Sequence, residues 1–277
     1  MTGFRQVASV LLIGAALTVS WTQADGSTSS ATPRASGRWT VGFHDGFDGS
    51  SLDSERWGTC FWWAEDDGCT ILSNDEDQWY GPEQVRVADG RLHLSARPSE
   101  SAHHGRTFGY ASGMVSSGRP GDRPDDVARY AFTYGSVEVR FRTPAGGGLW
   151  PAVWMLPVTN ESLPEIDLLE QYGDEPTRAS MTLHAQEDGE QVRNRRSLDT
   201  ADLTEGWHTV GVDWTEDRLV WFLDGTEVFR VEGDRVPREP MYLLANLAVG
   251  GNAGEPPADT RFPATLLIDE ITVWRPA

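Results

Sequence analysis

The stretch GSVEVRFR, residues 135–142, alternates apolar and polar side chains with the period of two that is typical of a β-strand. Val137, Val139 and Phe141 fall on one face of this strand, and the charged side chains fall on the other. We therefore expect one face of the strand to pack on a hydrophobic core and the other to face a polar environment.

The same period recurs toward the C-terminus, in residues 209–214 and 266–274. The runs 219–223 and 227–231 flank Asp224-Gly225, a dipeptide typical of a tight hairpin turn. After the N-terminal region no long run has a helical period, and 29 Gly and 16 Pro indicate many turns. The sequence predicts an all-β protein, a sandwich of two antiparallel sheets.

Length and charge restrict the classes of function. The chain has 277 residues, which one large β-sandwich domain can accommodate. Lys and Arg number 23 against 42 Asp and Glu, so the formal net charge is −19. Phosphate backbones and anionic membranes repel such a chain, and we expect neither nucleic acid nor a membrane as a partner. The 12 Trp suit both a core and a cleft that stacks on sugar rings.

The N-terminus predicts export. Residues 1–24 resemble a signal peptide, with Arg5, an apolar run over 7–19 and small residues at the cleavage site. That run is shorter than the roughly 20 residues of a membrane-spanning helix. We expect a secreted protein with a flexible Ser/Thr-rich leader over 25–40 and one folded domain over 41–277.

The two cysteines, Cys60 and Cys69, lie nine positions apart. In an exported chain such a pair predicts a disulfide that closes one local loop. A pair without histidines at ligand spacing is poor evidence for zinc. We expect this loop to lie on the surface, apart from catalysis.

The run EIDLLE (165–170) places three acids inside an apolar, strand-like segment. Glu165 and Asp167 share a face, but Glu170, five positions after Glu165, points to the opposite face of a regular strand. A β-bulge at Leu168-Leu169 would return it to the shared face. Three carboxyls on one face suit a retaining glycosidase, whereas the alternative is an edge strand with solvated acids.

Two indoles lie just upstream, in a segment that also predicts a strand. Trp150 and Trp154 are four positions apart and share one face of an extended strand. There they can stack on sugar rings beside the acids, or they can fill the core.

These residues resemble glycoside hydrolase family 16, with EIDLLE in the bulged form of laminarinase-like members. Supporting stretches occur in the family's order over roughly residues 41–275: YASG (110–113), FTYG (132–135), LWPAVWM (149–155), TLH (182–184), WFLDG (221–225) and NLAVGGN (246–252). The resemblance implies a concanavalin-like jelly roll with a cleft across one sheet, and endo-hydrolysis of β-linked polysaccharides without a catalytic cofactor.

The resemblance also implies roles for single residues. Glu165 matches the nucleophile, Asp167 the assisting acid and Glu170 the general acid/base. Residues that match the sugar site are Trp150, Trp154, His184, Asn74 and Asn246. A lone histidine such as His184 can instead be structural. A structural Ca²⁺ on the convex side would be held by the carbonyls of Gly46 and Gly90 and the carboxylate of Asp269.

Three features depart from the family pattern and bear on linkage preference. Met114 stands where many β-1,3-glucanases have Arg, and the connection over 118–129 is longer than usual. Ala253 stands where a Trp often follows the late Gly-Gly-Asn.

We expect a monomeric, secreted, retaining endo-hydrolase whose partner is its polysaccharide substrate, β-1,3-glucan or mixed-linkage β-glucan. The alternatives are a lectin-like domain that binds sugar without cleaving it, and an endo-hydrolase of β-galactan or bacterial exopolysaccharide. A binding domain has no use for a proton donor, so the complete acid triplet favours an enzyme.

Overall fold

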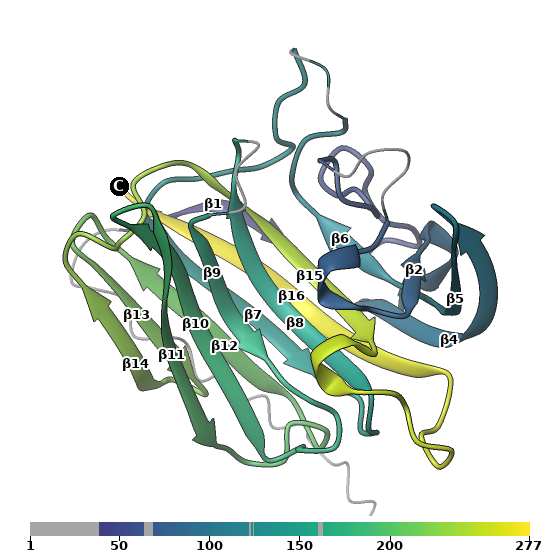
Figure 1. Cartoon of the computed structure of the whole chain (residues 1–277). Helices are drawn as coiled ribbons and strands as arrows, with labels where there is room; N and C mark the ends of the chain where they lie inside the picture. Colours follow the sequence, from purple (N-terminus) through teal and green to yellow (C-terminus); the bar gives the residue numbers. More distant parts are fainter. Residues whose placement is uncertain (1–38, 64–68, 122, 124, 160–162) are drawn as a thin grey trace, which may run out of the picture.

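The computed structural model describes residues 39–63, 69–121, 123, 125–159 and 163–277, which form two β-sheets packed face to face (Figure 1). The predicted signal peptide and nearly all of the predicted leader lie outside the described residues. Within the described part, no helix is both long enough and apolar enough to cross a membrane.

The larger sheet contains ten strands within the described residues, in the order β14-β13-β12-β7-β16-β4-β5-β2, with β1 beside β16 and β3 beside β4. Its strands are β1 (Trp39–Asp45), β2 (Gln78–Tyr80), β3 (Val85–Ala88), β4 (Arg91–His103), β5 (Arg106–Ser112), β7 (Gly135–Arg142), β12 (His208–Trp214), β13 (Arg218–Leu223), β14 (Thr226–Glu232) and β16 (Ala264–Pro276). Strand β7 coincides with the stretch from which we predicted the fold.

The smaller sheet has the order β11-β10-β9-β8-β15-β6. Its strands are β6 (Met114–Ser116), β8 (Leu149–Pro157), β9 (Glu165–Glu170), β10 (Arg178–Glu187), β11 (Glu190–Asp199) and β15 (Met241–Val249). Three short 3₁₀ turns occur among the described residues, η1 (Leu72–Asn74), η2 (Pro82–Gln84) and η3 (Gly251–Ala253). Strand pairing is antiparallel except between β2 and β5, which run parallel at the edge of the larger sheet. The predicted all-β sandwich is confirmed, with this one parallel pair as the difference.

The main core lies between the two sheets and follows the predicted alternation. Val137, Val139 and Phe141 are at most 1% exposed and belong to this core. The predicted hairpin turn is also present, because Asp224 (φ 49°) and Gly225 (φ 74°) both occupy the left-handed region that a type I′ turn requires.

A second apolar cluster covers part of the outer face of the smaller sheet. Odd-numbered residues of β8, such as Val153 and Met155, face the main core, whereas Trp154 and Leu156 face this second cluster. Its other members come from β2, β6, β15 and the segment before β2; they include Phe61, Trp62, Tyr80, Met114 and Tyr242. The cluster leaves the adjoining part of β8, β9 and β10 open to solvent as a cleft.

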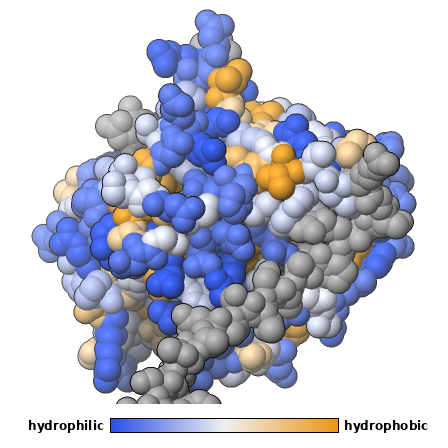
Figure 2. Space-filling view, turned by 180° about the vertical axis from the view of Figure 1, so that it is seen from behind, coloured by the Kyte–Doolittle hydropathy of each residue, from blue (hydrophilic) through white to orange (hydrophobic). Residues whose placement is uncertain are grey.

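The side of the molecule opposite to that seen in Figure 1 is mostly hydrophilic, with small separate apolar patches (Figure 2). A polar surface on this side agrees with the high content of acidic residues in the sequence.

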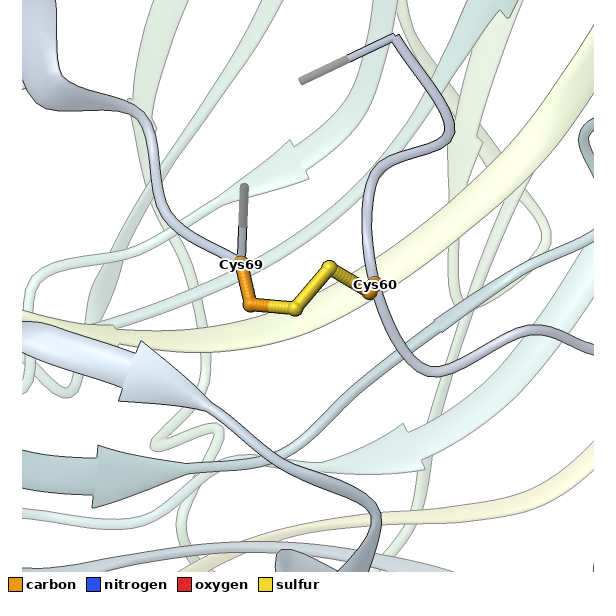
Figure 3. Close-up of a disulfide and its surroundings, with 2 residues drawn as sticks. All are labelled: Cys60 and Cys69. Carbon is orange, nitrogen blue, oxygen red and sulfur yellow. A yellow bond between two sulfur atoms is a disulfide. The ribbon is translucent and has the colours of Figure 1, made fainter. Parts of the chain in front are cut away.

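The predicted disulfide between Cys60 and Cys69 is present, with their Cα atoms 4.9 Å apart (Figure 3). The bond joins the two ends of a loop whose middle residues, 64–68, lie outside the described part.

Candidate active site

A β-bulge in β9 brings the three acids to one face. Ala152 pairs with Glu170 and Trp154 pairs with Asp167, so a step of two residues on β8 opposes a step of three on β9. The register of β10 shifts at the same place. Leu168, the extra residue, and the leucine after it are fully buried in the main core. The predicted bulge is confirmed.

The acids line a cavity of about 400 Å³ on the outer face of the smaller sheet. This cavity contains every residue that we predicted for catalysis or sugar binding: Asn74, Trp150, Trp154, Glu165, Asp167, Glu170, His184 and Asn246. These residues come from η1, β8, β9, β10 and β15. The side chains that line the cavity and that we did not predict include Trp63, Glu76, Gln191, Arg193, Arg195 and Asn252.

The two predicted indoles form part of the cavity wall and are held in different ways. Trp154 donates a 2.8 Å hydrogen bond from Nε1 to Oδ1 of Asn246. Trp150 packs edge-on against Tyr172, and its Nε1 is buried without a hydrogen-bond partner among the described residues. Both indoles are less than a tenth exposed. Each indole therefore both fills the protein interior and offers an edge to a sugar, since most of each ring packs against protein and an edge borders the cavity.

A hydrogen-bond network around a buried carboxylate supports the two predicted asparagines. Asn74 donates from Nδ2 to Oε1 of Glu76 at 2.9 Å, and Gln78 donates to the second oxygen. Asn246 donates from Nδ2 to the Tyr80 hydroxyl at 2.9 Å. Glu76 is 3% exposed, and this burial raises the pKa of its carboxyl. The network restricts the orientation of both asparagines at the cavity.

Burial and mutual repulsion favour protonation of the acids. Burial raises the pKa of Glu165 well above its ordinary range, and the charge of Asp167 and a hydrogen bond with it act in the same direction. Burial, followed by the charge of Asp167, raises the pKa of Glu170 to about 7, although the nearby Arg195 acts against this rise. The cluster therefore retains a proton near neutral pH.

His184 lies beside the acids, on β10. Its Nε2 is 3.2 Å from Oδ2 of Asp167, and its backbone pairs with that of Glu165. A ligand atom from each of these three residues lies within 4.8 Å of the other two. The group could therefore also bind a metal ion, which would compete for the same carboxylates.

The residues predicted to hold Ca²⁺ do not fit that ion. Asp269 forms an ion pair with Arg140 and lies 3.5 Å from Nε of Arg91, so two guanidinium groups already neutralise its carboxylate and would repel a cation. Gly46 and Gly90 lie instead next to the Asp48 side chain. We therefore assign no role to calcium.

The departures from the family pattern lie outside the cavity. Met114 is fully buried in the second cluster, and the described residues of 118–129 do not line the cavity. Ala253 follows Asn252, which does line it.

The loop closed by the disulfide is closer to the site than we expected. Trp63 borders the cavity and packs on Phe61, whose ring centroid lies 6.1 Å from that of Trp154. The aromatic run 61–63 directly after Cys60 was the available signal in the sequence. For Arg193 and Arg195 the signal was their spacing of two in a strand, but the spacing does not say which face meets the cleft.

Comparison with known proteins identifies the family to which these residues belong. The model of the family described as glycosyl hydrolases family 16 matches residues 73–263. The endo-1,3-1,4-beta-glycanase EglC of Rhizobium meliloti is 33% identical over 249 residues, which are 85% of this chain and 51% of that protein. ExsH, an endo-1,3-1,4-beta-glycanase of the same organism, is 34% identical over 229 residues, 79% of this chain and 47% of that protein. The chain thus spans about half the length of these curated relatives.

Among solved structures, the catalytic domain of an endo-1,3-beta-glucanase (laminarinase) from Thermotoga petrophila superposes with a TM-score of 0.76. It is 26% identical, and the match covers 87% of this chain and 99% of that one. The similarity therefore extends over almost the whole described sandwich.

Proposed function

This chain belongs to glycosyl hydrolases family 16, and from that premise we propose that it is a retaining endo-β-glucanase. The observation that carries the proposal is the bulge at Leu168, because it gathers three carboxyls in one solvent-accessible cavity. The similarity to an endo-1,3-beta-glucanase and to two endo-1,3-1,4-beta-glycanases supports a β-1,3-glucan or a mixed-linkage β-glucan as the substrate.

In the proposed reaction, Glu165 attacks the anomeric carbon while Glu170 protonates the leaving glycosidic oxygen. The glycosyl group is then bound to Glu165 as an ester. Glu170, now ionised, removes a proton from a water molecule, which attacks the anomeric carbon and releases Glu165. A pKa of about 7 suits Glu170 to both steps, because it can donate and accept a proton near neutral pH.

Glu165 must be ionised to attack, although its burial favours the protonated form. The hydrogen bond between Glu165 and Asp167 fixes the orientation of the nucleophile. His184, with its Nε2 3.2 Å from Oδ2 of Asp167, helps to orient that carboxyl. We propose Asp167 as the group that positions the nucleophile in both steps.

We propose that the wall of the cavity selects a β-glucan through Trp150, Trp154 and Trp63. Indole edges and faces offer apolar contact to the CH groups of a pyranose, and the two asparagines offer amides to its hydroxyls. This combination is suited to a neutral sugar ring held next to the acids.

The test is proton NMR of the first products from laminarin and lichenan. We expect the β-anomer to appear first and then to mutarotate, and we expect no product from Glu165→Gln. A first-formed α-anomer would show inversion. Cleavage of agar or porphyran alone would favour a galactanase, and binding without any new reducing ends would favour a lectin-like domain.

We further propose that the enzyme is exported as a monomer. The predicted signal peptide supports export, and so does the disulfide, since such bonds persist in oxidising compartments. Sequencing the N-terminus of protein from the culture medium should give a start near Asp25, and size-exclusion chromatography should give the mass of one chain.

A further inference from the structure

One edge of the cleft carries a row of polar side chains, which we call the β11 row: Gln191, Arg193, Arg195 and Ser197. These residues are two positions apart, so their side chains leave the same face of the strand. Strand β11 pairs with β10 over ten consecutive residue pairs without a shift, which keeps the four side chains on that face. The first three line the cavity that contains the acids.

The two arginines of the β11 row differ in their contacts. Arg195 donates to the Ser180 hydroxyl at 3.0 Å and lies 3.7 Å from Oε2 of Glu170. Arg193 lies opposite His184 in the register, and its side chain forms no ion pair or hydrogen bond with another described residue. Although the chain has 42 acidic and 23 basic side chains, its guanidinium has no ion-pair partner among the described residues.

The space next to the row continues beyond the acids. A second recess of about 330 Å³ is lined by Glu170 and Arg195, which also line the first cavity, and by Ser197 and Arg178. A polysaccharide chain that extends from one recess to the other would run along the β11 row.

Resting on the endo-glucanase function proposed above, we infer that the β11 row binds a carboxylate substituent of the substrate, with Arg193 as its main contact. A guanidinium presents parallel N–H donors that match the two oxygens of a carboxylate, and a neutral glucan needs no such charge. Gln191 and Ser197 offer further polar contacts beside it.

The net charge restricts the density of these substituents. A charge of −19 repels a polyanion, but at physiological ionic strength this repulsion is largely screened beyond about 8 Å. An isolated carboxylate close to Arg193 therefore experiences attraction, whereas a polymer with an acid on every sugar would be repelled along its length. The substrate class that we infer is a β-glucan with sparse acidic substituents.

The experiment compares laminarin with the same laminarin lightly oxidised at C6 to introduce carboxylates. Wild-type enzyme should have the higher kcat/KM on the oxidised polymer, and added NaCl should reduce this preference. Arg193→Gln should lower the ratio of the two kcat/KM values about tenfold, which is about 1.4 kcal/mol of discrimination. Arg193→Lys should retain part of the preference.

The matched control is Arg196→Gln, which removes the same charge from an exposed residue of β11 on the opposite face. It should keep the wild-type ratio. Equal ratios for wild type and Arg193→Gln would overturn the inference. If neither polymer is cleaved, the proposed function fails instead, and affinity electrophoresis in gels containing each polymer then tests the row: retardation stronger in oxidised laminarin and lost in Arg193→Gln supports it, and equal retardation contradicts it.

Discussion

Glu170 pairs with Ala152 on β8, whereas an unbroken register continued from Asp167 would place it opposite Pro151. That difference of one residue turns the side chain of Glu170 from the core to the cleft. The acid triplet thus depends on the backbone as much as on the identity of its residues.

Deleting Leu168 should remove the bulge but keep Glu170 on the cleft face, because Glu170 then follows Asp167 by two positions in a regular strand. The variant should retain a substantial part of kcat on laminarin. Deleting both Leu168 and Leu169 instead places Glu170 next to Asp167 and on the core face, and without an acid to protonate the leaving oxygen kcat should fall by roughly 10²–10⁴-fold. Leu168→Ala is the control, because it leaves the bulge in place. It should lower the free energy of unfolding by about 2–5 kcal/mol in urea denaturation and retain most of kcat. Substantial activity of the double deletion, or complete loss of activity in a folded single deletion, would contradict this role of the bulge.

The two glutamates should respond differently to azide. In Glu170→Ala, azide should attack the glycosyl ester on Glu165 and restore turnover with a β-glycosyl azide as product. In Glu165→Ala, azide should replace the nucleophile and give the α-product. Product NMR distinguishes the two anomers, and the reverse pattern would exchange the assigned roles.

The alkaline limb of the pH profile should report Glu170. Because Glu170 must be protonated to act as an acid, kcat/KM should fall as pH rises through about 7. Arg195 favours the ionised form of Glu170, so Arg195→Met should raise the pKa of Glu170 and move this limb to higher pH. Arg196→Met, on the opposite face, should leave the limb in place, and an unshifted limb in Arg195→Met would contradict the assignment.

Glu170 should also make the free energy of unfolding depend on pH. The carboxyl of Glu170 has a higher pKa in the folded protein than the ordinary value of 4.5, so the folded state binds more protons between pH 4.5 and about 7. The free energy of unfolding should therefore fall as pH rises through this window. Glu170→Gln should make that fall less steep, which urea titrations at several pH values can measure.

Glu76 should act as a positioning residue for Asn74. In Glu76→Gln, one amide group of the new side chain faces two donors, and a buried unpaired donor costs about 1–3 kcal/mol of stability. Because Asn74 borders the cavity, KM should rise more than kcat falls, and Glu76→Asp should recover part of the loss. Glu83→Gln, an exposed change on η2, is the control and should alter neither constant. A change in stability with unaltered KM would mean that Glu76 is only structural.

Local pattern determined the all-β class of this protein. Strand β7, the hairpin at Asp224 and the burial of Ile166 between two acids follow from the pattern of neighbouring residues alone. The three acids also predicted the bulge, because burying them in an apolar run is costly unless they share one polar cleft. Most of the candidate site was therefore predictable.

Tertiary structure decided which distant segments meet at those acids. Nothing local to β11 indicates that Arg193 faces the cleft, and nothing local to β16 indicates that Asp269 is neutralised by arginines of β4 and β7. A side chain's partners across a sheet depend on strand order and register, and these are set by contacts between residues far apart in the chain. For the same reason the disulfide-closed loop could be predicted as a loop, but its contribution of Trp63 to the cavity arises only when the loop packs against β8.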